Sequence, residues 1–250
     1  MIIIPARLES TRFPQKILAD IYGLPMIVAT ARNAQKTDEV VVACDSHSVL
    51  EICTTHKIKA VLTSPHHTSG TDRCAEASRI LGLKSDEIII NVQADEPFLE
   101  TQVILSLQEA MKNAPFMGTC AKIIEKNQIH DTNLVKVVCN KFQEAVYFSR
   151  LPIPYSREGL ENPLLQTSPY YGHLGIYGFH AQSLEEFCQL PKTSLEDIEK
   201  LEQLRAIYHK KSIFIQIVTS KSIGIDTPID LQKALNSISQ TQWLASLESH

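Results

Sequence analysis

The stretches VVVAC (residues 40–44) and IIINV (residues 88–92) decide the fold class of this chain. Each is a short, continuous apolar run, which is typical of a parallel strand covered by helices on both faces. Amphipathic stretches alternate with such runs through the first half of the chain, so the sequence predicts an α/β fold. We expect strands over 1–5, 39–44, 59–63 and 87–92, and helices over 25–34, 48–56, 71–81 and 101–113.

The pattern changes after residue 116. Apolar runs over 117–124, 134–139 and 145–148 follow one another without a convincing helix between them, which favours antiparallel strands. Residues 151–171 are rich in Pro, Ser, Asn and Gly and predict a long surface connection. Beyond it we expect a strand over 173–180, a helix over 195–209 with a capping box at Ser194 and Asp197, a strand over 212–218 and a last helix from Pro228.

The composition excludes several classes of protein. Of the 250 residues 44% are hydrophobic and 21% are charged, so the chain can bury a core and is not disordered. A formal net charge of -4 argues against nucleic acid as a partner. No apolar run approaches the roughly 20 residues of a membrane helix, and no signal peptide is recognisable, so we expect a cytoplasmic protein without a membrane partner. The 6 cysteines include no CxxC pair, which favours buried thiols over a redox or zinc site.

A polar loop with three cations, PARLESTRFPQK (residues 5–16), follows the first strand. In open α/β sheets, ligands bind at the carboxyl ends of the strands. Arg7, Arg12 and Lys16, with the hydroxyl and backbone N–H groups of the loop, are suited to cradle a polyphosphate. The alternative is a solvated basic loop. Neither GxxxxGK[ST] nor GxGxxG after a strand occurs, which argues against a P-loop and against an ordinary dinucleotide site.

Two aspartates follow predicted strands. Asp95 lies in NVQADEP (residues 91–97), and Asp226 lies in GIDTP (residues 224–228). A carboxylate beside a basic loop is suited to hold Mg²⁺, which takes oxygen ligands and shares its coordination shell with substrate phosphates. Each position also has a purely structural interpretation, because Asp-Glu-Pro can start a helix and Asp226 can cap one.

Three further segments carry polar side chains. TSGTDR (residues 68–73) opens a helix and either receives a base or ribose or serves only as a helix cap. Residues 196–205 predict a helix with a solvated acidic face, from which Glu202 and Gln203 are placed to reach a polar substrate. His173 and Tyr177 alternate on a strand and therefore share a face. His66 and His67 lack metal-ligand spacing and are predicted to be surface residues.

These motifs together resemble the 3-deoxy-manno-octulosonate cytidylyltransferases, also called CMP-Kdo synthetases. The resemblance covers nearly the whole chain and is carried, in order, by PARLESTRFPQK, SGTDR, NVQADEP, VKVV, YFSR, HLGIYGF, EKLEQLRA and GIDTPIDL. It implies a nucleotide-diphospho-sugar transferase-like α/β fold, with a mostly parallel sheet flanked by helices and an antiparallel strand elaboration for dimerisation. We expect a single domain over 1–250, with a core at about 1–124 and 190–250 and the dimerisation and sugar-site elaboration at about 125–189.

The resemblance also implies an activity. The enzyme would join CTP and the sugar acid Kdo to give CMP-Kdo and pyrophosphate for lipopolysaccharide synthesis, as a homodimer with Mg²⁺. By matching position, the catalytic residues would be Arg12, Lys16, Asp95 and Asp226, of which Asp95 and Asp226 would be the Mg²⁺ ligands. The nucleotide would be held by Pro5, Ala6, Arg7, Ser10, Arg12, Lys16, Ser69, Gly70, Thr71, Arg73 and Gln93. The sugar would be held by Arg150, His173, Tyr177, Glu202 and Gln203.

Two positions depart from the family pattern. Gln15 stands where Gly usually precedes the Lys, and Ala94 replaces the Gly between Gln and Asp, although Gly allows backbone conformations that Gln and Ala resist. Several alternatives stay open on the sequence: the same chemistry on 8-amino-Kdo or a sialic acid-like substrate, a non-catalytic nucleotide-binding protein, and a nicotinamide dehydrogenase. The last of these lacks its glycine fingerprint.

Overall fold

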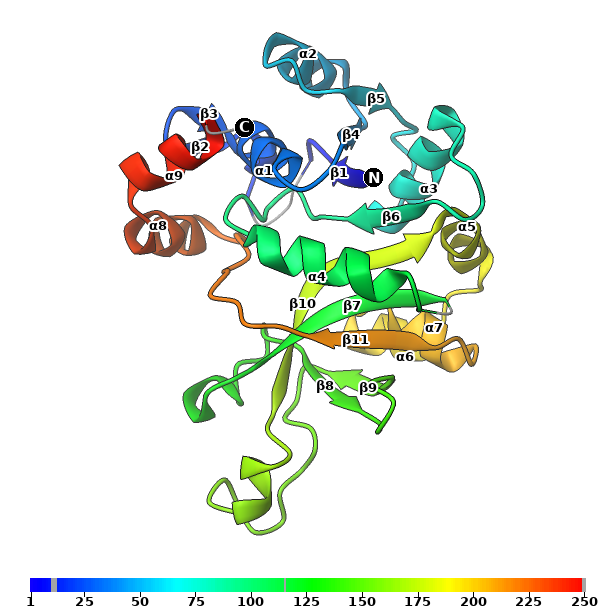
Figure 1. Ribbon diagram of the computed structural model, residues 1–250, viewed down its shortest axis with the longest axis vertical. Coiled ribbons are helices and arrows are strands. Elements are labelled where there is room, and N and C mark those ends of the chain that lie inside the picture. Colours follow the sequence, from blue (N-terminus) through cyan, green and yellow to red (C-terminus); the bar gives the residue numbers. More distant parts are fainter. Residues whose placement is uncertain (10–12, 115, 249–250) are drawn as a thin grey trace.

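The computed structural model describes residues 1–9, 13–114 and 116–248 (Figure 1). Within these ranges nine strands form one sheet, in the order β11-β7-β10-β6-β1-β4-β5, with β8 and β9 attached beside β10. The parallel part consists of β1 (Ile2–Ala6), β4 (Val40–Cys44), β5 (Ala60–Leu62) and β6 (Ile88–Asn91). Strand β1 lies at its centre, because Ile2 is in register with Val40 on one side and Ile90 on the other.

Strand β10 (Tyr171–His180) introduces the antiparallel part of the sheet. It runs antiparallel to both β6 and β7 (Met117–Ile123), and β11 (Ile213–Ile217) then pairs parallel with β7. The antiparallel pair β8 (Lys136–Cys139) and β9 (Ala145–Ser149) extends beyond the main sheet, with the 150–170 connection further out (Figure 1). The predicted fold class, a mostly parallel sheet with an antiparallel elaboration, is confirmed; the division into domains stays a prediction.

Helices cover both faces of the sheet because successive strand residues point to opposite sides. Ile2, Ile4 and Val42 pack into one core cluster, whereas Ile3 and Ala43 pack into the other. The first face carries α1 (Met26–Gln35), α2 (His47–Thr55) and α4 (Thr101–Met111). The second carries α3 (Gly70–Leu81), α5 (Ala181–Gln189), α6 (Ser194–Glu199) and α7 (Leu204–Tyr208).

The C-terminal helices form a separate small cluster. Helices α8 (Pro228–Ser237) and α9 (Gln240–Glu248) pack with the start of α1 and with the hairpin of β2 (Asp20–Ile21) and β3 (Leu24–Pro25). Figure 1 shows them beside α1, at one side of the sheet. None of the helices in the described part has the length and apolar character needed to cross a bilayer.

The helices differ from the predictions in four details. The helix expected over 195–209 is interrupted, because Lys200 takes a left-handed conformation with φ 55° and ends α6. The cap of α6 is Thr193 rather than Ser194, since the Thr193 side chain accepts a hydrogen bond from the Glu196 backbone. Helix α5 was not predicted, although Ala181, Leu184 and Phe187 bury one of its faces. The last helix is two helices, α8 and α9.

Glycines in the late strands serve packing. A Cβ at either Gly118 or Gly178 would lie 2.8 Å from the sulfur of Met111, so the absence of a side chain lets α4 lie close to β7 and β10. At Gly172 the neighbours are the side chains of Ile124 and Leu134. Glycine at Gly172 and Gly178 therefore allows close approach of neighbouring protein atoms.

Candidate active site

A cleft of about 270 Å³ lies at the carboxyl ends of β1 and β6. It contains most of the predicted nucleotide and metal residues, which come from four separate parts of the chain: Pro5, Arg7, Lys16, Ser69, Gly70, Arg73, Gln93, Asp95 and Asp226. Glu9, Ile17, His67, Thr68 and Ala94 complete the wall. Ser10 and Arg12 lie outside the described residues. Ala6 and Thr71 are buried behind the wall.

Lys16 joins the two aspartates of the cleft. Its Nζ lies 2.5 Å from Oδ2 of Asp95 and 3.1 Å from Oδ1 of Asp226. Burial alone would lower the pKa of Lys16, but the charges of Asp95 and Asp226 and the hydrogen bonds to them outweigh burial, so the pKa is raised. The ammonium is therefore charged at neutral pH and lies between the two carboxylates.

The loop before Lys16 reaches its conformation without glycine. Gln15 has φ 51° and ψ 32°, which is the left-handed region where Gly is most easily accommodated. A short 3-10 helix, Lys16–Leu18, begins directly after it. Ala94 has no positive φ. Both departures from the family pattern are thus compatible with a loop that delivers Lys16 to Asp95.

The two aspartates suit a divalent cation. Their carboxylates converge on one positively charged atom, Lys16 Nζ, so the site is already shaped to surround a cation. Within 1–9, 13–114 and 116–248, no group of three or more His, Cys, Asp and Glu side chains is arranged to hold a metal ion. Two carboxylates fit Mg²⁺, which completes its shell with water and phosphate oxygens.

The start of α3 forms a second wall of the cleft. The Ser69 hydroxyl caps the helix by accepting from the Asp72 backbone at 3.1 Å, as the structural interpretation of this segment predicted. Gly70 approaches the first strand so closely that a Cβ would lie 3.0 Å from Pro5 Cγ and 3.6 Å from Gln93 Oε1. Glycine at this position therefore keeps open the space between α3, β1 and Gln93.

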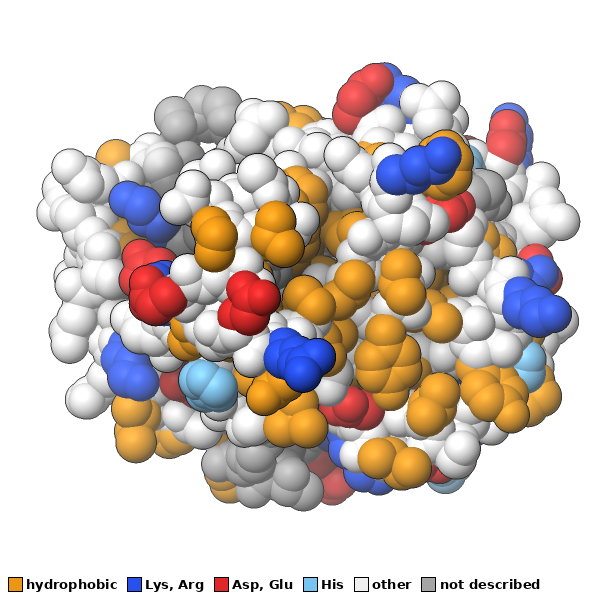
Figure 2. Space-filling view, turned by 90° about the horizontal axis from the view of Figure 1, so that it is seen from below, with side chains coloured by type: hydrophobic (Ala, Val, Ile, Leu, Met, Phe, Trp, Pro, Cys, Tyr) orange, Lys and Arg blue, Asp and Glu red, His pale blue; other side chains and the backbone are white. Residues whose placement is uncertain are grey.

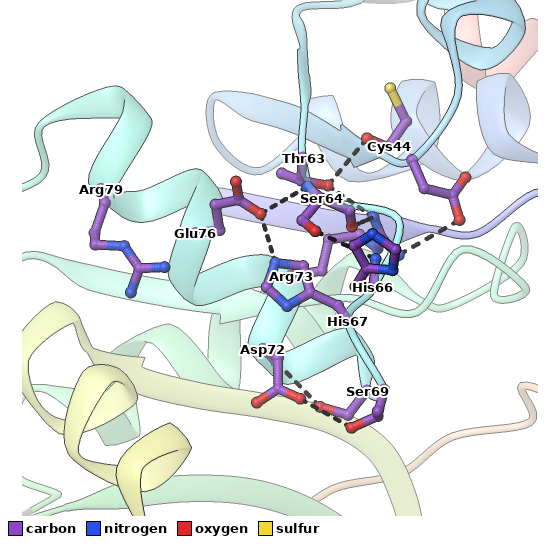
Figure 3. Close-up of polar contacts among 12 residues, drawn as sticks. Cys44, Thr63, Ser64, His66, His67, Ser69, Asp72, Arg73, Glu76 and Arg79 are labelled. Atoms are coloured by element: carbon purple, nitrogen blue, oxygen red, sulfur yellow. Dashed lines mark hydrogen bonds and ion pairs between the residues drawn. The ribbon is translucent and has the colours of Figure 1, made fainter.

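Arg73 braces this wall from behind. Its guanidinium donates to the Thr63 hydroxyl at 2.7 Å and the Ser64 carbonyl at 3.2 Å, and it lies 3.4 Å from Asp45 (Figure 3). Only 2% of the residue is exposed. Because its donors are used by neighbouring loops, Arg73 holds the 63–64 connection against the start of α3.

His66 is exposed, as predicted, whereas His67 is only partly exposed and lines the cleft. Its Nε2 lies 2.5 Å from a carboxylate oxygen of Glu76 on α3, and the same oxygen accepts from the Ser64 backbone at 2.8 Å (Figure 3). Burial would raise the pKa of Glu76, but these hydrogen bonds and the neighbouring positive charges lower it. The usable sequence signal was the position of His67 in a strand-to-helix connection directly before the SGT motif.

Four of the predicted sugar residues form a buried group next to the cleft wall. The Tyr177 hydroxyl donates to Gln203 Oε1 at 3.1 Å, and the Thr71 hydroxyl donates to Glu202 Oε1 at 2.5 Å. The His173 ring lies 5.5 Å from that of Tyr177, as expected for residues sharing a strand face. Burial raises the pKa of Glu202 and lowers that of His173 to about 3.

The comparisons with known proteins agree on one family. The cytidylyltransferase family model matches residues 1–213. A 3-deoxy-manno-octulosonate cytidylyltransferase of Helicobacter pylori is 58% identical over 240 residues, 96% of this chain and 98% of the relative. The chain belongs to the 3-deoxy-manno-octulosonate cytidylyltransferase family. A second member, from Wolinella succinogenes, is 53% identical over 242 residues, 94% of this chain and 98% of that protein.

A solved structure supports the same assignment. CMP:2-keto-3-deoxy-manno-octonic acid synthetase, complexed with CTP, superposes with a TM-score of 0.87 at 36% identity, covering 96% of this chain and 98% of that one. The predicted nucleotide-diphospho-sugar transferase-like fold and the predicted family are therefore confirmed.

One residue assigned through the family lies apart from the others. Arg150 is not among the described residues that line the cleft. Its Nε donates to the Glu199 carbonyl at 2.8 Å, and a second guanidinium nitrogen donates to the Thr132 carbonyl at 3.1 Å. Its backbone N–H and the Ser149 hydroxyl both donate to the Glu199 carboxylate. Arg150 is thus held at the junction of β9 and α6, and its role toward the sugar stays a prediction.

Proposed function

We propose that this protein joins CTP and the sugar acid Kdo to give CMP-Kdo and pyrophosphate, with Mg²⁺, for lipopolysaccharide synthesis. The observation that carries the proposal is the position of Lys16 between Asp95 and Asp226, at the end of a cleft whose other wall is the start of α3. Two carboxylates that could hold a cation beside a basic loop are what transfer of a nucleotidyl group requires, and this supports the proposal. A cytoplasmic location stays a prediction from the sequence.

The cleft divides naturally into two ends. At one end the basic loop with Arg7, Arg12 and Lys16 would hold the triphosphate, since Arg offers a planar fork and Lys a compact charge. At the other end Pro5, Gly70 and Gln93 would surround the cytosine and ribose, in the space that glycine leaves open. Ser69, Thr71 and Arg73 would shape that end from α3.

The reaction is a single displacement at the α-phosphorus. The anomeric hydroxyl oxygen of the sugar forms a bond to the α-phosphorus and its proton passes to water, while the bond from that phosphorus to the bridging oxygen breaks and pyrophosphate leaves with the electron pair. Mg²⁺ held by Asp95 and Asp226 would supply neutralisation of the charge that develops on the phosphate oxygens. Lys16 adds a fixed positive charge beside both aspartates, and Tyr177, Glu202 and Gln203 would orient the sugar.

The test of this function is pyrophosphate release from each common ribonucleoside triphosphate, with and without Kdo and Mg²⁺. We expect release only when CTP, Kdo and Mg²⁺ are present together. Release with 8-amino-Kdo alone would change the sugar assignment but keep the chemistry. The absence of release with every sugar acid, despite CTP binding, would replace the proposal with a non-catalytic nucleotide-binding protein.

We also propose that the protein acts as a homodimer through its antiparallel elaboration. Large apolar side chains are exposed there, and Figure 2 shows apolar side chains gathered on the face seen from this end of the molecule. They are Ile123, Phe142, Val146, Leu151, Tyr155 and Leu164, each more than half exposed. Exposed apolar surface of this kind is typical of a protein interface, and a second copy of the chain is the partner that the family resemblance implies.

A further inference from the structure

Buried polar atoms without partners are concentrated beside the active-site cleft. Among the described residues, the side-chain atoms that are buried and lack any hydrogen bond are Asn91 Nδ2, Glu202 Oε2, Gln203 Nε2 and Trp243 Nε1. The last belongs to the C-terminal helix cluster. Folded proteins satisfy nearly all buried polar groups with protein atoms, water or a ligand, so the three beside the cleft wall need a partner that the protein itself does not supply.

The three atoms belong to one neighbourhood. Asn91 on β6 stands directly opposite Tyr177 on the antiparallel strand β10, so their side chains share a face of the sheet. The Tyr177 hydroxyl reaches Gln203, and the adjacent residue Glu202 is bonded to Thr71 at the start of α3. Asn91, Glu202 and Gln203 therefore lie around the same place, between β6, α3 and the turn before α7.

Asn91 also touches the nucleotide wall. Its Oδ1 accepts a hydrogen bond from Gln93 Nε2 at 3.1 Å, and Gln93 lines the cleft. The residue is 0% exposed, so Nδ2 has no access to bulk solvent. The Asn91 side-chain oxygen thus binds Gln93, at the nucleotide end of the cleft. Its NH₂ group has no partner and lies beside the predicted sugar residues.

We propose that Asn91 is a substrate-contacting residue whose Nδ2 donates a hydrogen bond to the sugar acid, where the sugar meets the nucleotide. This rests on the proposed function. Nδ2 of Asn91 and Nε2 of Gln203 are donors, and Oε2 of Glu202 is an acceptor when ionised. Two donors and one acceptor match a ligand that carries a carboxylate and several hydroxyl groups.

The competing explanation is that Asn91 serves only to orient Gln93. The variant Asn91→Asp separates the two, because it keeps an oxygen to accept from Gln93 and replaces the Nδ2 donor by a second oxygen. We expect the KM for Kdo to rise about tenfold or more, as for loss of a hydrogen bond to a charged group, while CTP affinity measured by calorimetry stays near that of the wild type. An unchanged KM for Kdo would overturn the proposal.

Two further variants keep the result interpretable. Asn91→Ala removes both contacts, so the KM for Kdo should rise together with a weaker CTP affinity; if Asn91→Asp fails to fold, a wild-type KM for Kdo in Asn91→Ala overturns the proposal. Asn113→Asp makes the same chemical change at an exposed position and should alter neither constant. Failure of the wild type to use Kdo at all would instead contradict the proposed function.

Discussion

Lys16 and Asp95 are 79 positions apart in the sequence, yet Lys16 Nζ lies 2.5 Å from a carboxylate oxygen of Asp95. Asp226, from the opposite end of the chain, accepts from the same ammonium at 3.1 Å. These three residues therefore join the loop after β1, the end of β6 and the segment before α8 in one charged centre. A substrate with a triphosphate and a divalent cation would meet all three groups at once.

Replacing Lys16 tests its part in that centre. Lys16→Ala should lower kcat about a hundredfold, because a fixed charge that stabilises the transition state is lost, and it should change the KM for CTP much less. Steady-state kinetics with CTP varied at saturating Kdo would separate the two constants. Lys112→Ala, at an exposed position, is the control. A rise in the KM for CTP with kcat intact would show that Lys16 only binds substrate.

Asp95→Asn removes a charge while keeping the volume of the side chain. We expect a folded protein with a thermal midpoint near that of the wild type and almost no Mg²⁺-dependent turnover. Titration of Mg²⁺ in the presence of CTP, followed by calorimetry, should show weaker cation binding. Mg²⁺ affinity equal to that of the wild type would mean that Asp95 is not a ligand.

The buried His173 predicts a pH dependence of stability. Burial lowers its pKa from 6.5 to about 3. The Thr119 hydroxyl donates its proton to the Ile176 carbonyl at 2.6 Å. The same hydroxyl oxygen therefore accepts from Nε2 of the neutral His173 ring at 2.8 Å. Between the two pKa values the unfolded chain binds a proton that the folded protein does not, so this residue makes stability fall as the pH falls through that window.

The size of this effect follows from the pKa difference. At pH 5 the neutral His173 makes the folded protein about 2 kcal/mol less stable than it is well above pH 6.5. His173→Phe should reduce the slope of the unfolding free energy against pH between pH 6.5 and 4. The same variant should be less stable than the wild type at pH 7. Urea unfolding at several pH values measures it. Identical slopes for the variant and the wild type would mean that His173 is charged, or solvated, in the folded protein.

The exposed apolar side chains of the elaboration predict an effect on assembly. Val146 is 53% exposed on β9 and Leu151 is 64% exposed just beyond it. The double variant Val146→Asp with Leu151→Asp should shift the protein from dimer to monomer, as measured by light scattering. Ile80→Asp, an exposed position on α3, provides a matched control. A wild type that is monomeric at micromolar concentration, or a variant that remains dimeric, would contradict this interface.

Much of the parallel sheet could be predicted, because continuous apolar runs such as VVVAC have few other uses. The cleft could also be located, since a basic loop and two aspartates all follow strands of a sheet whose carboxyl ends meet. The interruption at Lys200 could not, because the apolar spacing over 195–209 continues through it. Across that break Glu196 of α6 and Arg205 of α7 form a buried ion pair at 2.5 Å, a contact that the apolar spacing does not reveal.

Residues without periodicity were the hardest to assign. His67 lies in a loop, and its pairing with Glu76 depends on how α3 packs against that loop. Asn91 continues an apolar strand, so the pattern explains its burial but not its unpartnered amide nitrogen. A buried donor without a partner becomes visible only when the side chains around it are placed.

The central claim, nucleotidyl transfer from the α-phosphorus of CTP to the sugar acid, is tested most directly by following the fate of each phosphate. Wild-type protein would be incubated with Mg²⁺, Kdo and CTP labelled either at the α- or at the γ-phosphorus, and the products separated. We predict the α-label in a CMP-sugar conjugate and the γ-label in pyrophosphate, in equal amounts. An α-label that appears only in free CMP or remains in CTP would contradict the proposed reaction.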